Sequence, residues 1–195
     1  MNATLPGARP LNDGPEPISR NRFPPGDAIA WSRPGDFVLV SGTSWRSWVI
    51  SGYQRLRARR PEERPSACWN HAALVVRADG SIVEAGTAGV VFQHLEKYRD
   101  EDYHYVAIPA TPEQRRRAVR FAVSCVGAQY PNLAIADIAV SMITRGRLRL
   151  PVPRYDLCGS LVAGALTCAG ERFDMPPRDM MPADLAVHYG VAPGS

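Results

Sequence analysis

The segment YDLCGSLVAGAL, residues 155–166, places a cysteine where nucleophilic chemistry needs one. Cys158 directly precedes a short apolar run that predicts a helix, and Asp156 lies just before it. The dipole and the free N–H groups of a helix N-terminus favour negative charge, and the thiolate is the reactive form of cysteine. Gly159 and Ser160 leave space beside the sulfur. The segment therefore predicts a nucleophile, and the alternative is a cysteine that only packs in the core.

A nucleophilic cysteine also needs a base, and histidine is the usual one. His71 stands directly before the apolar run AALVV, and a histidine that enters a buried strand has to find partners for its ring nitrogens. The other three histidines are less well placed. His94 and His104 have polar neighbours in strands, and His188 lies near the C-terminus. We therefore predict that His71 is the base, and a structural histidine is the alternative.

The elements that must position these residues follow from the apolar pattern and its turn signals. The order is a strand, a helix, several antiparallel strands and then helices, which indicates an α+β protein with one sheet covered on a face by helices. Thr111 and Gln114 form a capping box at the start of the best-marked helix. The predicted elements are strands within 35–42, 90–95 and 103–109, a hairpin at 70–86, and helices within 43–60, 111–127, 132–144, 158–168 and 181–190.

The helix predicted within 43–60 begins at Ser44, whose hydroxyl can cap it. Apolar residues fall near helical spacing, with arginines elsewhere on the surface, which predicts that the apolar face packs inward. The apolar residues are Trp45, Trp48, Val49, Tyr53 and Leu56.

The length of 195 residues fits one domain, and residues 1–28 are rich in Pro, Gly and Asn. We predict a flexible arm over 1–28 and a single domain over 29–195. The sequence shows no secretory leader and no membrane-spanning run, and its four cysteines form no CxxC pair. A cytoplasmic protein with reduced thiols is therefore expected, with export by another route left open. Neither a cofactor nor a metal is expected, because the cysteines and histidines lack metal-ligand spacing.

The basic residues are almost all arginine, and Lys97 is the only lysine. Arginine-rich stretches occur at 55–64, 115–120 and 145–154, and they favour carboxylate or phosphate groups, or an anionic surface, as partners. The last stretch lies nearest to Cys158 in sequence. No nucleic-acid recognition motif is found, so no nucleic-acid partner is expected. An ordinary solvated surface is the alternative for each stretch.

Three segments, PGDFVLV, WNHAALVVRADGSIVEAG and YDLCGSLVAGAL, together resemble the circularly permuted branch of the NlpC-like, papain-fold cysteine hydrolases. In that branch the histidine strand precedes the cysteine helix, as it does here. The resemblance implies a papain-like antiparallel sheet or half-barrel packed against helices. It also implies that Cys158 is the nucleophile, His71 the base and Glu84 the residue that orients the imidazole. The chain departs from the family pattern in two places: His71 is followed by Ala-Ala and not x-Gly, and Cys158 is followed by Gly-Ser and not by Ser and an acidic residue.

Counting residues along the hairpin gives a separate expectation for Glu84. The Asp79-Gly80 pair predicts a two-residue turn, which would place Val75 opposite Glu84. His71 and Glu84 would then share a face of the sheet but be offset by about four residues, or about 13 Å along the strand. Contact between them would need strong twist, a bulge or a slipped turn.

The expected function is a cysteine hydrolase, either an amidase or peptidase or an acyl thioesterase or esterase, that works through an acyl-enzyme. An acyl-, peptide- or lipid-like substrate is the expected partner. Tyr130, Tyr155 and Trp69 are candidates to bind it, the tyrosines as hydrogen-bond donors near the thiolate. The alternative is a catalytically inactive papain-like fold that binds a peptide, lipid or cell-wall fragment.

Overall fold

The computed structural model describes residues 19–27, 29, 31–58, 60–128 and 158–192. Its centre is a six-stranded sheet in the order β1-β6-β2-β3-β4-β5, in which every neighbouring pair is antiparallel. The sheet confirms the predicted α+β class. The strands are β1 (Ser19–Phe23), β2 (Phe37–Ser41), β3 (His71–Val75), β4 (Ser81–Gly86), β5 (Gly89–His94) and β6 (Asp102–Ala107).

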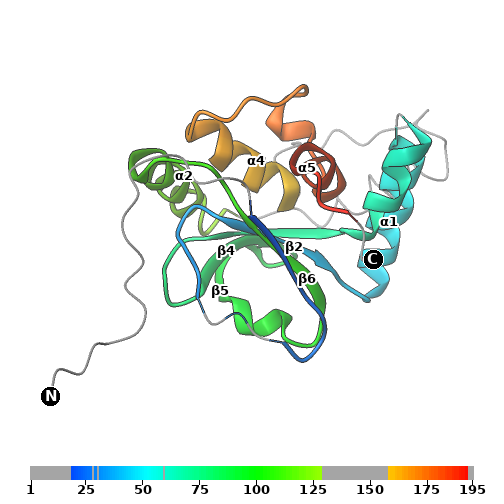
Figure 1. The fold of residues 1–195 in the computed structure, drawn as a ribbon, viewed down its shortest axis with the longest axis horizontal. Helices are drawn as coiled ribbons and strands as arrows, with labels where there is room; N and C mark the ends of the chain where they lie inside the picture. The colour runs from blue at the N-terminus through cyan, green and yellow to red at the C-terminus, as the bar shows by residue number, and fades with distance from the viewer. Residues whose placement is uncertain (1–18, 28, 30, 59, 129–157, 193–195) are drawn as a thin grey trace, which may run out of the picture.

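Helices cover one side of this sheet, where α2, α4 and α5 lie together (Figure 1). The α-helices are α1 (Trp45–Arg57), α2 (Pro112–Ser124), α4 (Cys158–Cys168) and α5 (Pro182–Tyr189). Three short 3₁₀-helices complete the described elements: η1 (Pro61–Cys68), η2 (Leu95–Tyr98) and η3 (Pro177–Asp179). The predicted helix at 132–144 lies outside the described residues.

The helices cover one face of the sheet, as the sequence predicts, and the other face is buried in a second core. Side chains alternate between the two faces of a strand. Phe37 and Leu39 of β2 therefore join the core beneath the helices, whereas Val38 and Val40 join a second core that includes residues of η2. This second core matters for function because η2 contributes two of its side chains to the candidate site.

The helix ends follow the local sequence signals. Ser44 accepts from the N–H group of Ser47 at the start of α1, and Thr111 and Gln114 form the predicted capping box at the start of α2. Gly190 ends α5 in the left-handed conformation, which glycine adopts without strain. These helix boundaries are therefore confirmed as predicted.

The orientation of α1 differs from the prediction. Trp48 and Leu56 are 75% and 70% exposed, whereas Gln54 is buried. The Gln54 amide donates to the backbone oxygens of Ala67 (3.3 Å) and Trp69 (2.9 Å), so a polar side chain occupies the inner face. The expected inward apolar face is wrong because the backbone groups beneath α1 need a hydrogen-bonding partner.

Residues 19–23, placed by the sequence in a flexible arm, form the edge strand β1. β1 pairs with β6 from Ser19, opposite Ala107, to Phe23, opposite Tyr103. Phe23 also stacks on Tyr103, with ring centroids 5.1 Å apart. The sheet therefore begins inside the predicted arm.

The hairpin register differs from the two-residue turn that Asp79-Gly80 predicts. Val75 pairs with Ile82, and Ala73 pairs with Glu84. The N–H groups of Val76 and Arg77 both donate to the Ser81 oxygen, at 2.8 and 3.3 Å, which is the two-against-one pattern of a bulge. The longer loop moves Glu84 two positions along β3, so that it lies diagonally opposite His71 and within reach of it.

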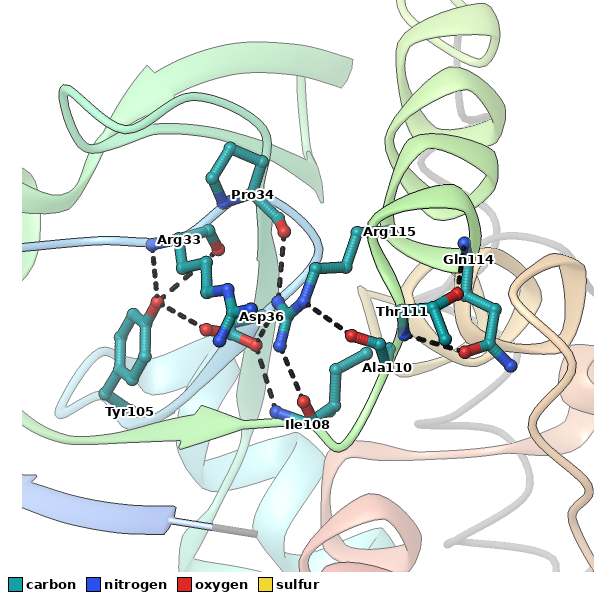
Figure 2. Close-up of polar contacts among 9 residues, drawn as sticks. All are labelled: Arg33, Pro34, Asp36, Tyr105, Ile108, Ala110, Thr111, Gln114 and Arg115. Atoms are coloured by element: carbon teal, nitrogen blue, oxygen red, sulfur yellow. Dashed lines mark hydrogen bonds and ion pairs between the residues drawn. The ribbon is translucent and has the colours of Figure 1, made fainter. Parts of the chain in front are cut away.

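A buried ion pair fixes α2 to the start of β2 (Figure 2). The carboxylate of Asp36 accepts from Arg115 Nη1 at 2.6 Å, from the Ile108 N–H group at 2.9 Å and from the Tyr105 hydroxyl at 2.9 Å. Burial raises the pKa of Asp36, and these three donors oppose that rise. The left-handed Gly35 leaves room for Arg115, whose side chain would lie 3.0 Å from an added Cβ. The Gly-Asp pair of PGDFVLV is thus structural here.

Candidate active site

Three secondary structure elements bring Cys158, His71 and Glu84 to one place. Cys158 is the first residue of α4, His71 the first of β3, and Glu84 lies in β4. The start of α4 lies against the start of β3: Cys158 Sγ is 4.0 Å from the backbone oxygen of Asn70. Cys158 is 5% exposed. The cysteine is therefore held at a helix N-terminus, beside the strand that carries the histidine.

Glu84 is fixed by three donors, two of which come from η2. Its Oε2 atom lies 2.7 Å from His71 Nε2 and also accepts from the Tyr98 hydroxyl. Its Oε1 atom accepts from Lys97 Nζ. Glu84 and Tyr98 are both buried, which makes each of these contacts hard to replace with water. The contact between His71 and Glu84 that the resemblance implies is present, through the bulged register described above.

The charges of this group support one another. Burial alone would lower the pKa of His71, but the Cys158 thiolate and the Glu84 carboxylate raise it to about 10. Burial raises the pKa of Glu84, and hydrogen bonds and charge from His71, with the donors Lys97 and Tyr98, lower it to about 2. Histidine is therefore the cation and glutamate the anion at neutral pH. Because Nε2 faces Glu84, Nδ1 is the ring nitrogen left for the thiol.

Tyr98 stays a neutral donor in this arrangement. Burial and the neighbouring Glu84 carboxylate raise the pKa of Tyr98 well above its usual value. The Tyr98 hydroxyl therefore keeps its proton and donates to Glu84 Oε2, the same oxygen that contacts His71 Nε2. Sequence reasoning missed both Tyr98 and Lys97. The one signal in the sequence is that Lys97 is the only lysine among many arginines.

Asn70 is a second residue that the sequence reasoning missed. Its side chain is buried, and it exchanges two hydrogen bonds of 3.0 Å with the backbone of Gly42. Its Nδ2 atom also donates to the Cys68 oxygen at 3.1 Å and contacts Ser51 Oγ at 3.4 Å. Asn70 therefore fixes the backbone immediately before His71, where its own carbonyl lies beside Cys158.

Gly159 lies where α4 packs closely on the segment before α5. A Cβ atom at this position would lie 2.6 Å from the carbonyl carbon of Met181 and 2.7 Å from the nitrogen of Pro182. The first turn of α4 thus packs directly on the backbone that leads into α5. A serine after Cys158 does not fit here, so glycine is a packing requirement of this chain.

The remaining predicted residues fall into two groups. Trp69 is fully buried and packs edge-on against His104, with ring centroids 5.0 Å apart. Its indole N–H group has no hydrogen-bond partner among the residues that the structure describes. Its role in substrate binding stays a prediction. Tyr130 and Tyr155 lie outside the described residues, as does the arginine-rich stretch 145–154.

The other histidines have structural contacts. His94 caps η2 by accepting from the N–H group of Glu96 at 3.3 Å, and His188 lies 3.1 Å from a Glu171 oxygen. The other thiols include Cys168, which is exposed. Of the histidines in the chain, His71 is the one that contacts the carboxylate network of the site.

The assignment of function rests on this geometry. No protein-family model matches the chain, and no curated protein matches it either.

Within the described ranges no three His, Cys, Asp or Glu side chains converge in the way a metal ion requires. In the same ranges no helix has the length and apolar character needed to cross a bilayer.

Proposed function

We propose that this protein is a cysteine hydrolase that cleaves an amide or ester bond through an acyl-enzyme, on a circularly permuted papain-like fold. The main support is the 2.7 Å contact between His71 and a buried Glu84, with Cys158 at the adjoining helix N-terminus. The chain order, with the histidine strand before the cysteine helix, supports the permuted fold. The substrate is an acyl, peptide or lipid compound with a reactive carbonyl group.

In the proposed reaction His71 already holds the proton of the Cys158 thiol as an imidazolium, and the thiolate attacks the carbonyl carbon to form a C–S bond. The carbonyl oxygen takes up the electron pair and accepts a hydrogen bond from the N–H group of Cys158 at the start of α4. The intermediate collapses to a thioester, and the leaving amine or alkoxide takes the proton from His71. His71 then removes a proton from water, which attacks the thioester and releases the acid and the thiol.

Glu84 acts through His71 and does not touch the reacting atoms. Its carboxylate orients the imidazole through Nε2 and stabilises the imidazolium that forms when the thiol loses its proton. Lys97 and Tyr98 hold that carboxylate in turn. By holding the Glu84 carboxylate in place, Lys97 and Tyr98 also keep the His71 imidazole in a fixed orientation.

The decisive experiment compares thiols within the same protein. The alkylation rate of each cysteine is measured by mass spectrometry from pH 5 to pH 10, in the wild type and in His71→Ala. The ordinary pKa of a cysteine thiol is ~8.5. Below that pH we expect the buried Cys158 to react faster than the exposed Cys168. In His71→Ala we expect Cys158 to lose this difference in rate. A Cys158 that reacts more slowly than Cys168 at every pH, with no response to His71→Ala, would refute the hydrolase proposal.

The burial of Cys158 favours a second candidate, a papain-like fold that binds a peptide, lipid or cell-wall fragment without cleaving it. A thiol with so little exposed surface serves packing as readily as catalysis. The same alkylation series separates the two candidates, since the binding role predicts no activation of Cys158 by His71.

A further inference from the structure

Helix α1 exposes two large apolar side chains to solvent and buries a polar one against the protein. Trp48, Gly52 and Leu56 are spaced four residues apart and share one face of the helix. Trp48 and Leu56 are the two most exposed large apolar side chains among the described residues, at 75% and 70%. The opposite face carries Gln54, which is buried and bonded to the backbone. This is the reverse of the usual amphipathic surface helix.

The outward face is surrounded by arginine. Arg55 lies in the last turn of α1. Arg60 directly precedes η1, Arg64 lies within it, and both are exposed. Residues 45–64 contain six arginines and two glutamates, a surplus equal to the formal charge of +4 of the whole chain. The formal charge of the rest of the chain is therefore zero, and the surplus falls within the sequence segment that contains Trp48 and Leu56.

We propose that the α1–η1 surface, residues 47–58 and 60–64, binds the surface of an anionic lipid bilayer. A helix with Trp and Leu on one face and arginines beside them is typical of elements that lie in the headgroup region. Tryptophan favours the interface between headgroups and hydrocarbon, and arginine is attracted to the negative surface potential of anionic lipids. The proposal does not depend on the hydrolase activity, since lipid binding needs no reaction.

The charge also argues against a second copy of the chain as the occupant. A two-fold interface pairs the same patch of both copies. On this face it would bring the arginines of one copy against those of the other, and like charges in contact oppose association. A bilayer that contains phosphatidylserine supplies the opposite charge and an apolar layer together.

The surface is directly connected to the candidate active site. Ser51 of α1 contacts the Asn70 amide at 3.4 Å, and Asn70 precedes His71. The Asn70 carbonyl lies 4.0 Å from Cys158 Sγ. A bilayer bound at α1 would therefore contact the helix that supports Asn70, next to the candidate active site. This arrangement favours a substrate that is a component of the membrane.

The test is co-sedimentation of the full chain with vesicles of phosphatidylcholine alone or with added phosphatidylserine. We expect binding to the phosphatidylserine vesicles only, weakened by salt, and reduced about tenfold or more in Trp48→Ser. The matched control is Trp31→Ser, because Trp31 is 50% exposed and packs edge-on against Tyr105 of β6. Circular dichroism establishes that both variants are folded.

A second pair of variants tests the charge. The variant Arg55→Gln/Arg60→Gln/Arg64→Gln is expected to lose binding roughly a hundredfold. Its control, Arg116→Gln/Arg117→Gln/Arg120→Gln on α2, changes the net charge equally and should bind as the wild type does.

Three results would overturn the proposal. The first is equal binding to both kinds of vesicle, or binding to neither. The second is equal loss in the variants of α1–η1 and in their controls. The third is a dimer of the lipid-free protein, seen by sedimentation velocity, that Trp48→Ser dissociates, because the occupant would then be a second copy.

Discussion

Replacing Glu84 with glutamine tests the electrostatic core of the site, because glutamine keeps the size of the side chain and removes its charge. The pKa of His71 is about 10 in the folded protein, so the imidazolium persists until the pH rises through that value. Without the carboxylate at 2.7 Å, the imidazolium is less stable and loses its proton at lower pH. Lys97, whose side chain is 38% exposed, can turn to solvent when its partner is lost, so the variant should fold.

The expected size of the change follows from the charge that is removed. An opposite charge at hydrogen-bonding distance shifts a pKa by about 1–3 units, so the pKa of His71 should fall from about 10 to about 7–9. At pH 9, roughly nine in ten wild-type molecules then carry the imidazolium, against roughly one in ten if the pKa is ~8. Each unit lost also makes transfer of the Cys158 proton to His71 about tenfold less favourable at neutral pH.

Two assays read this change independently. The ring proton of His71, assigned by its absence from His71→Ala, is titrated by NMR, and the alkylation rate of Cys158 is followed at pH 6–7. The control is Glu96→Gln, which removes an 81% exposed carboxylate from η2, the helix that carries Lys97. The reasoning is wrong if the His71 pKa and the Cys158 alkylation rate are the same in Glu84→Gln as in Glu96→Gln. The Glu84 carboxylate would then not stabilise the His71 imidazolium.

Two further substitutions test how the scaffold holds the site. Gly159→Ala places a Cβ 2.6 Å from the Met181 carbonyl carbon and should lower the free energy of unfolding in urea by about 1–3 kcal/mol. The control Gly86→Ala has no atom within 4 Å of the new Cβ and should be close to neutral. Equal effects of the two substitutions would contradict the packing argument. Asp36→Asn leaves the buried Arg115 charge unpaired and should cost about 3–5 kcal/mol, and a loss below about 1 kcal/mol would show that this pair does not anchor α2.

The features that could be predicted from sequence are those whose signals lie within a few residues. The capping box of Thr111 and Gln114 and the cap at Ser44 each join positions three residues apart, and both were correct. The register of the hairpin was wrong for a local reason. Asp79 uses its carboxylate to accept from the Ser81 N–H group (2.9 Å) and hydroxyl (2.6 Å), so it builds the turn in a different way from an Asp-Gly type I′ pair.

The orientation of α1 could not be predicted because its cause is far away in sequence. The inner face of α1 meets the backbone of residues 67–69 and the N–H group of Ala183, at 2.9 Å from Gln54 Oε1. Those groups need a polar partner once they are buried. The spacing of the apolar residues Trp48 and Leu56 predicts the helix correctly. It does not show which face of the helix packs against the core.

The third member of the site depends on a loop contact that no periodicity encodes. His94 ends β5 by donating from Nε2 to the Asp79 oxygen at 2.6 Å, while the Leu95 N–H group donates to the Gly80 oxygen at 3.0 Å. The loop that sets the register of Glu84 therefore also fixes the start of η2. Since η2 carries Lys97 and Tyr98, these two contacts link the position of the Glu84 carboxylate to the position of the donors that hold it. A longer or shorter loop at 77–80 would alter both at once, so the network around Glu84 forms only in this register.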